Sequence, residues 1–236
     1  MPYAAIWGGF FHPNSGITTT SHSLNISAIN AFELHFPADI FLENSIRAVA
    51  QPFAFERFLK QYHLLELRFD FDIIKKIQKL NIQTESDQIG EILTDYTNSR
   101  KEITRLEEIV FANCNDLQPI VDRINDSINF QNESFDLFFK YGSSKEGNPL
   151  KDKEVEFSTL LSSNFNETNL NFHKISYQKD YRKFILKLAC YWIYRIRSSI
   201  AHNKIGEYIL AMKDEKFIVE FGEPLLKEIL LQCFKK

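Results

Sequence analysis

The sequence has few of the residues that interrupt regular secondary structure, with 8 Gly and 7 Pro among 236 residues against 22 Phe. A β-sandwich needs a turn signal about every ten residues, so these low counts exclude a turn-rich sandwich and favour long helices. Hydrophobic residues make up 44% of the chain, which is enough for a large core. We therefore expect a mainly α protein.

Cysteine is also scarce, and long apolar runs are absent. Cys114, Cys190 and Cys233 are odd in number, far apart and without C-x-x-C spacing, which argues against a disulfide framework and a thiolate zinc site. No apolar run approaches the roughly 18 residues that a membrane span needs, and the N-terminus lacks the basic region of a secretory signal. We expect a cytoplasmic protein with free thiols, no metal, no cofactor and no membrane contact.

The chain has no overall excess of positive charge. Lys and Arg total 28 and Asp and Glu total 31, a net charge of -3, which does not by itself indicate a polyanion partner. The segment 179–204 differs, because it carries seven basic residues and one acidic residue. Its basic residues are Lys179, Arg182, Lys183, Lys187, Arg195, Arg197 and Lys204. Such local asymmetry is typical of a nucleic-acid-binding face, although Lys and Arg stems covering a bundle surface give the same pattern.

Apolar residues recur every three or four positions along most of the chain, which is the helical period. This spacing predicts helices over residues 52–80, 84–110, 116–128, 181–200 and 225–234. Pro119 and Pro224 lie in opening turns, where proline is tolerated. The predicted architecture is an up-down bundle of four or five helices.

Three regions depart from the helical pattern. Residues 1–50 contain irregular or β-leaning pieces and are predicted to be an N-terminal extension of uncertain fold before a helical domain over residues 51–236. Residues 142–172, rich in Ser, Asn, Glu and Lys, are predicted to be an insertion in that domain. The apolar triplets 208–210 and 217–219 predict a small hairpin before the last helix.

Several other motifs do not indicate chemistry. Residues 142–147 have the spacing of a phosphate loop, but Asn148-Pro149 replaces the Lys and hydroxyl residue that must follow. His63 lies beside Glu66 in the first predicted helix, where we interpret it as a histidine near the core, with Glu66 either orienting it or facing water. Four further histidines are isolated and are interpreted as solvated or structural: His12, His22, His35 and His173.

The C-terminal end of the predicted helix 181–200 carries Arg197 and, after four intervening residues, His202. This R-x-x-x-x-H spacing at the end of a long amphipathic helix resembles the HEPN superfamily, whose motif marks ribonucleases of toxin and phage-defence systems. Ser198 matches the small polar residue that commonly follows the Arg in that family. The resemblance implies a HEPN-like helical domain acting in abortive infection, antiviral defence or a toxin-like stress response.

The resemblance extends from about Pro52 to the C-terminus. The segment 58–66 is similar to the opening helix of the abortive-infection members, and His202-Asn203-Lys204 is similar to their motif end. Lys204 stands where a toxin subgroup silenced by a partner nucleotidyltransferase commonly has Tyr. That departure disfavours the subgroup, while a regulatory protein partner of another kind stays open.

The two motif residues suit metal-independent RNA cleavage. RNA supplies its own nucleophile, the 2′-hydroxyl, so the reaction needs a proton acceptor or donor and a cation at the developing phosphorane. A histidine, with an unperturbed pKa of about 6.5, suits the first role of His202, and a forked guanidinium suits the second role of Arg197. We expect Ser198, Asn203 and Tyr194 to orient the catalytic pair. We expect four basic residues to bind RNA, with tRNA a candidate: Arg195, Lys204, Lys187 and Lys183.

Positions i and i+5 of a straight helix lie about 140° apart, so one helix does not present Arg197 and His202 squarely to one phosphate. In HEPN enzymes two protomers join their motifs across a dimer axis, and the resemblance implies such a homodimer here. Two alternatives stay open at this point. One is a HEPN-like module without activity that serves in dimerisation or RNA binding within a larger defence assembly, and the other is an unrelated helical interaction protein.

Overall fold

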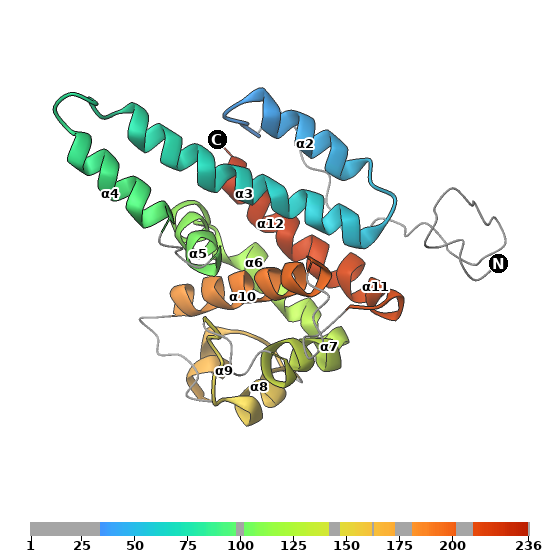
Figure 1. The fold of residues 1–236 in the computed structure, drawn as a ribbon. Coiled ribbons are helices and arrows are strands. Elements are labelled where there is room, and N and C mark those ends of the chain that lie inside the picture. The colour runs from blue at the N-terminus through green and yellow to red at the C-terminus, as the bar shows by residue number, and fades with distance from the viewer. Residues whose placement is uncertain are drawn as a thin grey trace.

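The computed structural model describes residues 34–97, 102–141, 147–161, 163–172, 181–201 and 210–235. Within those ranges the chain is helical and contains no strand, apart from an isolated bridge between Leu34 and Lys235. The predicted mainly α, bundle-like fold is thereby confirmed. Helix α10 crosses the middle of the molecule, with α3 and α12 on one side and α7, α8 and α9 on the other (Figure 1).

Helix α3 (Ala54–Gln78) confirms the helix predicted over 52–80. The single helix predicted over 84–110 is instead two helices, α4 (Ser86–Thr97) and α5 (Glu102–Asn113). Every residue from Thr97 to Glu102 is polar, so the apolar repeat skips a turn there. Residues 98–101 lie outside the described ranges.

Residues 39–49 are helical, so the prediction of irregular or β-leaning structure is wrong for this part of the N-terminal extension. Helix α2 (Asp39–Val49) buries Phe41 and Ala48, which are two helical turns apart. The Phe41 ring packs against Phe71 of α3 and Phe234 near the C-terminus, with ring centroids 5.6 and 5.5 Å apart. Residues 1–33 lie outside the described ranges.

A nearly continuous helical path follows α5. It comprises α6 (Leu117–Asn125), the 3-10 helix η2 (Asp126–Phe130), α7 (Gln131–Phe135) and the π-helix η3 (Asp136–Lys140). The predicted helix 116–128 is confirmed, and the path continues beyond it.

The predicted insertion at 142–172 contributes helices to the core. Helices α8 (Glu154–Leu161) and α9 (Glu167–Phe172) lie within it. Phe157 and Phe165 are buried, and each ring centroid lies 6.0 Å from that of Trp192. A few large apolar residues in a polar composition are therefore enough to dock this segment on α10.

Helix α10 (Tyr181–Ala201) confirms the helix predicted over 181–200 and is buried on most of its circumference. Its buried residues include six in succession, from Leu188 to Ile193. A helix that is apolar nearly all round belongs in the centre of a bundle rather than at its surface. Its neighbours are α3, α5, α6 and α12.

The hairpin predicted before the last helix is wrong for the described residues 210–219. They form the 3-10 helix η5 (Met212–Asp214), α11 (Glu215–Phe217) and the start of the π-helix η6 (Ile218–Gly222), which leads into α12 (Glu223–Phe234). The Asp214 carboxylate accepts a hydrogen bond from the Ala211 amide at 2.8 Å. The rings of Phe217 and Phe221 stack with their centroids 5.3 Å apart. Residues four apart meet on one face of a helix, which a hairpin would not provide.

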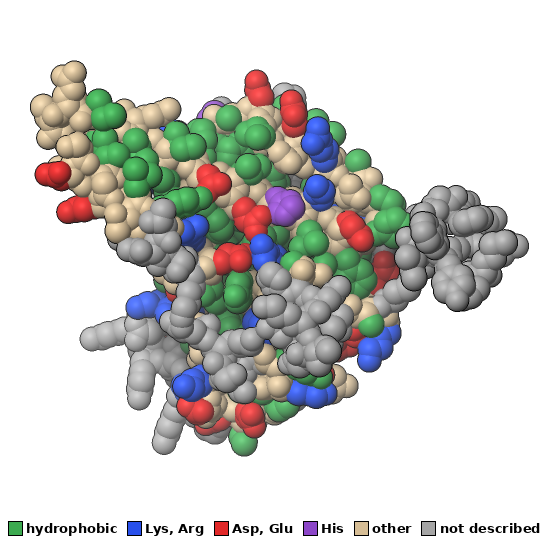
Figure 2. Space-filling model, in the orientation of Figure 1, with side chains coloured by type: hydrophobic (Ala, Val, Ile, Leu, Met, Phe, Trp, Pro, Cys, Tyr) green, Lys and Arg blue, Asp and Glu red, His purple; other side chains and the backbone are tan. Residues whose placement is uncertain are grey.

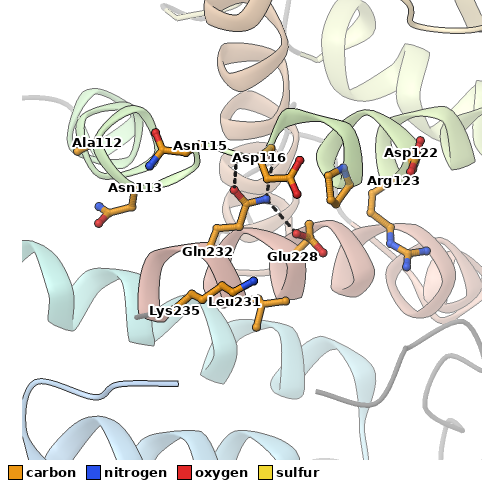
Figure 3. Close-up of a pocket in the computed structure, with 11 residues that line it drawn as sticks. Ala112, Asn113, Asn115, Asp116, Asp122, Arg123, Glu228, Leu231, Gln232 and Lys235 are labelled. Atoms are coloured by element: carbon orange, nitrogen blue, oxygen red, sulfur yellow. Dashed lines mark hydrogen bonds between the residues drawn. The ribbon is translucent and has the colours of Figure 1, made fainter. Parts of the chain in front are cut away.

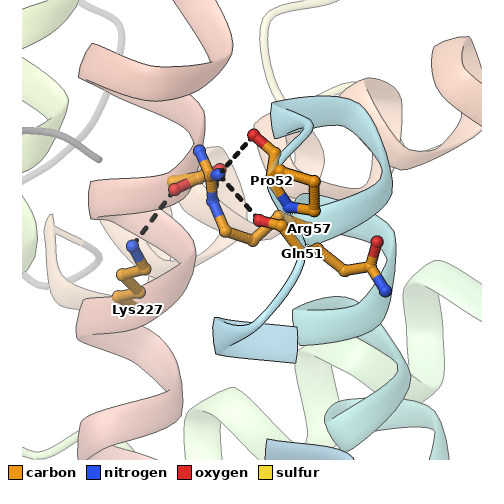
Figure 4. A network of polar contacts seen from close by, with 5 residues as sticks. Gln51, Pro52, Arg57 and Lys227 are labelled. Carbon is orange, nitrogen blue, oxygen red and sulfur yellow. Dashed lines mark hydrogen bonds and ion pairs between the residues drawn. The ribbon is translucent and has the colours of Figure 1, made fainter. Parts of the chain in front are cut away.

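A buried ion pair ties the start of α3 to the start of α12 (Figure 4). Arg57 Nε lies 2.7 Å from Glu223 Oε1, and both side chains are fully buried. Arg57 Nη1 donates to the carbonyls of Gln51 and Pro52 at 3.1 and 3.3 Å, and Lys227 Nζ lies 3.1 Å from Glu223 Oε2. These contacts supply partners to both charges where water has no access.

Replacing Glu223 by Ala is expected to lower the free energy of unfolding by about 3–5 kcal/mol, because Arg57 is left buried without its carboxylate. Urea unfolding followed by circular dichroism measures the change. Glu220→Ala, which removes the exposed carboxylate 3.8 Å from Lys216, is the matched control and should change stability by no more than about 1 kcal/mol. Equal effects of the two substitutions would contradict the structural role of the buried pair.

Candidate functional site

Arg197 lies near the C-terminal end of α10, where α10 meets α3 and α5. Its Nη2 donates to Glu66 Oε1 of α3 at 2.9 Å, and its Nε lies 3.3 Å from Glu102 Oε1 of α5. The Arg197 side chain is 19% exposed and each Glu side chain is 29% exposed. The guanidinium is therefore fixed between two carboxylates at the rim of the bundle.

Tyr62 of α3 forms the inner wall of this cluster. Its hydroxyl donates to Glu102 Oε1 at 2.7 Å, and the Arg197 guanidinium carbon lies 5.7 Å from the centre of its ring. Burial, followed by the charge of Glu102, raises the pKa of Tyr62 well above its ordinary value. Tyr62 thus stays a neutral hydrogen-bond donor that holds Glu102 in place.

His63 forms the outer edge of the cluster. Its Nε2 lies 3.5 Å from Glu66 Oε2, and its side chain is 45% exposed. Glu66 therefore has one oxygen on Arg197 and the other facing His63. On the face drawn in Figure 2, a histidine lies over α3 with acidic and basic side chains beside it.

The described part of the cluster carries more negative than positive charge. With a neutral imidazole, Glu66 and Glu102 outnumber Arg197 by one. Burial acts to lower the pKa of Arg197, but the charges of Glu102 and Glu66 outweigh it and raise the pKa. An anion approaching Arg197 therefore meets an already compensated charge.

Arg195 is not placed to contact RNA, which corrects the sequence-based expectation. It is 2% exposed, and its Nη2 donates to the Tyr141 carbonyl at 3.1 Å. Positions i and i+2 of a helix face nearly opposite directions. Arg195 therefore points into the bundle, while Arg197 reaches the rim. Arg195 is a structural residue that joins α10 to the end of η3.

The predicted orienting residues lie inside the bundle or at its edge. Ser198 is buried and Tyr194 is half-buried against the apolar core. The described carboxylate partners of the Arg197 side chain are Glu66 and Glu102. The predicted role of Ser198 and Tyr194 in orienting the pair stays a prediction.

The basic residues of the 181–201 helix do not form one continuous charged face. Lys183 is exposed, but Lys187 lies 3.8 Å from Glu107. Arg182 donates to the carbonyls of Phe111 and Cys114 at 3.2 and 2.9 Å. The positive surplus seen in the sequence is thus partly used in contacts between helices.

His202, Asn203 and Lys204 lie outside the described residues, so the structure places one member of the predicted catalytic pair. Glu66, Glu102 and Tyr62 were not predicted as site residues. The sequence carried a signal for Glu66 only in its position next to His63 on the first helix. Glu66 and Arg197 are 131 residues apart, and no local pattern links such positions.

A hollow of about 570 Å³ lies elsewhere, between the end of α5, the start of α6 and α12 (Figure 3). Gln232 bridges it, accepting from the Asp116 amide at 3.1 Å and donating to the Asp116 carbonyl at 2.8 Å. None of the predicted site residues lines it. Among the described residues there is no cluster of metal-ligating side chains, and no described helix is long and apolar enough to cross a membrane.

Tyr62→Phe is expected to flatten the loss of stability at high pH. Because the pKa of Tyr62 is raised in the folded protein, the unfolded chain loses this proton first, and the unfolding free energy falls above about pH 10 by up to about 1.4 kcal/mol per pH unit. Urea unfolding at several pH values measures the slope. Tyr96→Phe, at a surface hydroxyl bonded to Asp70, should flatten it much less, and equal slopes in wild type and Tyr62→Phe would contradict the assignment.

Comparison of the chain with protein-family models, curated proteins and solved structures finds no significant match to any of them. The resemblance to the HEPN superfamily is therefore a hypothesis that rests on the sequence motif and its helical setting.

Proposed function

We propose that this protein is a metal-independent endoribonuclease of HEPN type, acting in phage defence or a toxin-like stress response. The observation that carries the proposal is the position of Arg197. The arginine of the R-x-x-x-x-H motif reaches the bundle rim, where Glu66 and Glu102 fix its guanidinium, whereas its neighbour Arg195 is buried. A preorganised, partly exposed guanidinium suits binding of a phosphodiester.

The proposed chemistry uses the RNA 2′-hydroxyl as nucleophile. Attack on the adjacent phosphorus forms a 2′,3′-cyclic phosphate and releases the 5′-hydroxyl of the next nucleotide. Arg197 stabilises the charge that builds on the phosphoryl oxygens, and His202 moves a proton. By resemblance, two protomers combine their motifs across a dimer axis, and a regulatory partner or sensor holds the nuclease inactive.

The alternative is a HEPN-like module without activity that dimerises or binds RNA in a larger assembly. One observation favours it. Glu66 and Glu102 already compensate the charge of Arg197, an arrangement that also suits an arginine serving only to hold α3, α5 and α10 together.

Wild-type protein incubated with total tRNA in EDTA is expected to produce fragments ending in cyclic phosphate, because no step needs a metal. Arg197→Ala and His202→Ala should each lower cleavage by at least about 10²-fold, the scale of a lost proton-transfer group or charge stabiliser. Gel analysis and end-group mapping of the fragments measure the result.

Arg47→Ala and His35→Ala provide matched controls, since each removes the same residue type from an exposed position. Both controls should cleave like the wild type. If the wild-type dimer leaves tRNA intact while still binding it, the module without activity replaces the nuclease as the conclusion.

Light scattering on the purified protein is expected to give twice the chain mass of 27.7 kDa, because the composite site needs two motifs. A monomer that still cleaves RNA would contradict the composite site and leave the nuclease proposal standing.

A further inference from the structure

The cations of α10 are largely engaged inside the bundle, so a ligand rich in phosphate needs a basic surface elsewhere. Arg195 is buried, and Lys187 lies 3.8 Å from Glu107. Another hollow, of about 350 Å³, lies between the C-terminal half of α3 and α5. Four cationic and two acidic side chains line it. The cationic residues are Lys75, Lys76, Lys79 and Arg105.

The two hollows differ in the sign of their charge. The hollow that Gln232 bridges is lined by three acidic and two cationic side chains, so it is acidic. In the hollow between α3 and α5, one of the two acidic side chains is Asp72, which lies 3.2 Å from Arg68 Nε. Because Arg68 does not line the hollow, this pair offsets a negative charge and leaves the lining cations uncompensated. A concave basic surface on a chain of net charge -3 is typical of polyanion binding.

Lys75, Lys76 and Lys79 lie together at the end of α3, and all three are exposed. None of them forms an ion pair with a described acidic side chain, although Lys75 Nζ lies 4.7 Å from the centre of the Phe71 ring. Like charges three and four positions apart on a helix repel one another, and the negative end of the helix dipole offsets only part of this repulsion. Phosphate groups placed between the lysines would remove the rest.

Arg105 and Tyr96 favour RNA over other polyanions. Arg105 Nη2 donates to the Tyr96 carbonyl at 2.8 Å, and its guanidinium carbon lies 4.6 Å from the centre of the Tyr96 ring. Tyr96 is itself 37% exposed. An ordered guanidinium with an exposed aromatic ring beside it suits single-stranded RNA, because phosphates pair with the cation and bases stack on the ring.

Both walls of the hollow begin one helical turn beyond the carboxylates that hold Arg197. Phe69 follows Glu66 by three residues on α3, and Arg105 follows Glu102 by three residues on α5. Three residues span about 4.5 Å along a helix. An RNA strand bound in the hollow is therefore close enough to reach Arg197 with a neighbouring phosphate.

We propose that the hollow between α3 and α5 binds the phosphate backbone of a single-stranded part of the RNA substrate, with Lys76 and Lys79 as its main phosphate contacts. RNA as the ligand rests on the proposed function, whereas the basic character of the hollow does not. Arg105 holds the strand at the end nearer Arg197, and the two lysines hold it further along α3. Contacts of this kind do not read sequence, so binding depends strongly on salt and tolerates many sequences.

The test compares the double variant Lys76→Gln, Lys79→Gln with the double variant Lys213→Gln, Lys216→Gln. Both pairs are exposed lysines three positions apart, so each variant loses two charges from one short stretch of chain. Fluorescence anisotropy measures binding of a single-stranded, fully 2′-O-methylated RNA oligonucleotide, which cannot be cleaved. The variant in the hollow should raise the Kd at least about tenfold, and the control should change it less than about twofold.

Salt dependence and cleavage kinetics add two readouts. The slope of log Kd against log salt concentration should fall by about 1.4 in the hollow variant, since each lost phosphate contact on a single strand accounts for about 0.7. In cleavage of total tRNA the same variant should raise KM and keep kcat within about threefold, because the lysines hold substrate and transition state alike. Thermal unfolding confirms that each variant is folded.

Four results overturn the proposal. Equal RNA binding by the wild type and the hollow variant shows that the strand lies elsewhere, while the Arg197 and His202 tests of the nuclease stand unaffected. Equal losses in the hollow and control variants show only a general attraction of charge. Polyglutamate that displaces RNA at the same concentration of negative charge shows a site for acidic proteins instead. A wild type that neither binds nor cleaves RNA removes the proposed function and RNA as the ligand together.

Discussion

The structure depends on the burial of α10 on nearly all of its sides. Thirteen of its 21 residues are buried, and it packs against α3, α5, α6 and α12. Near its C-terminal end this helix keeps most of its polar side chains away from water. Arg195, Ser198 and Ser199 are accordingly buried, and Arg197 reaches the rim only through the space between α3 and α5.

The cluster at Arg197 follows from this constraint. A guanidinium that extends from a buried helix needs partners of opposite charge. Glu66 and Glu102 provide them from two different helices. The same solution appears at Arg57 and Glu223, but with a difference in access. The Arg57 pair is fully buried and holds α3 to α12, whereas the Arg197 pairs open on the surface beside His63. Access to solvent separates a structural ion pair from a candidate reaction centre.

Charge counted along the sequence does not translate directly into a binding face. The surplus of basic residues in 179–204 suggested a continuous RNA-binding surface, but Arg195 is buried and Lys187 lies near Glu107. Cations on a central helix meet the acidic residues of its neighbours before they meet a ligand. A charge excess therefore indicates nucleic-acid binding only where the helix that carries it faces outward.

The sequence by itself determined the mainly helical fold, the long helices 54–78 and 181–201, and the motif that contains Arg197, because helical periodicity and residue spacing are local properties. It misjudged residues 39–49 and 210–219, where two or three apolar anchors gave too weak a period. Only the tertiary structure brought Glu66, Glu102 and Tyr62 to Arg197, and only it separated Arg195 from the surface. Contacts between residues as much as 131 positions apart depend on how whole helices pack, and no local pattern encodes them.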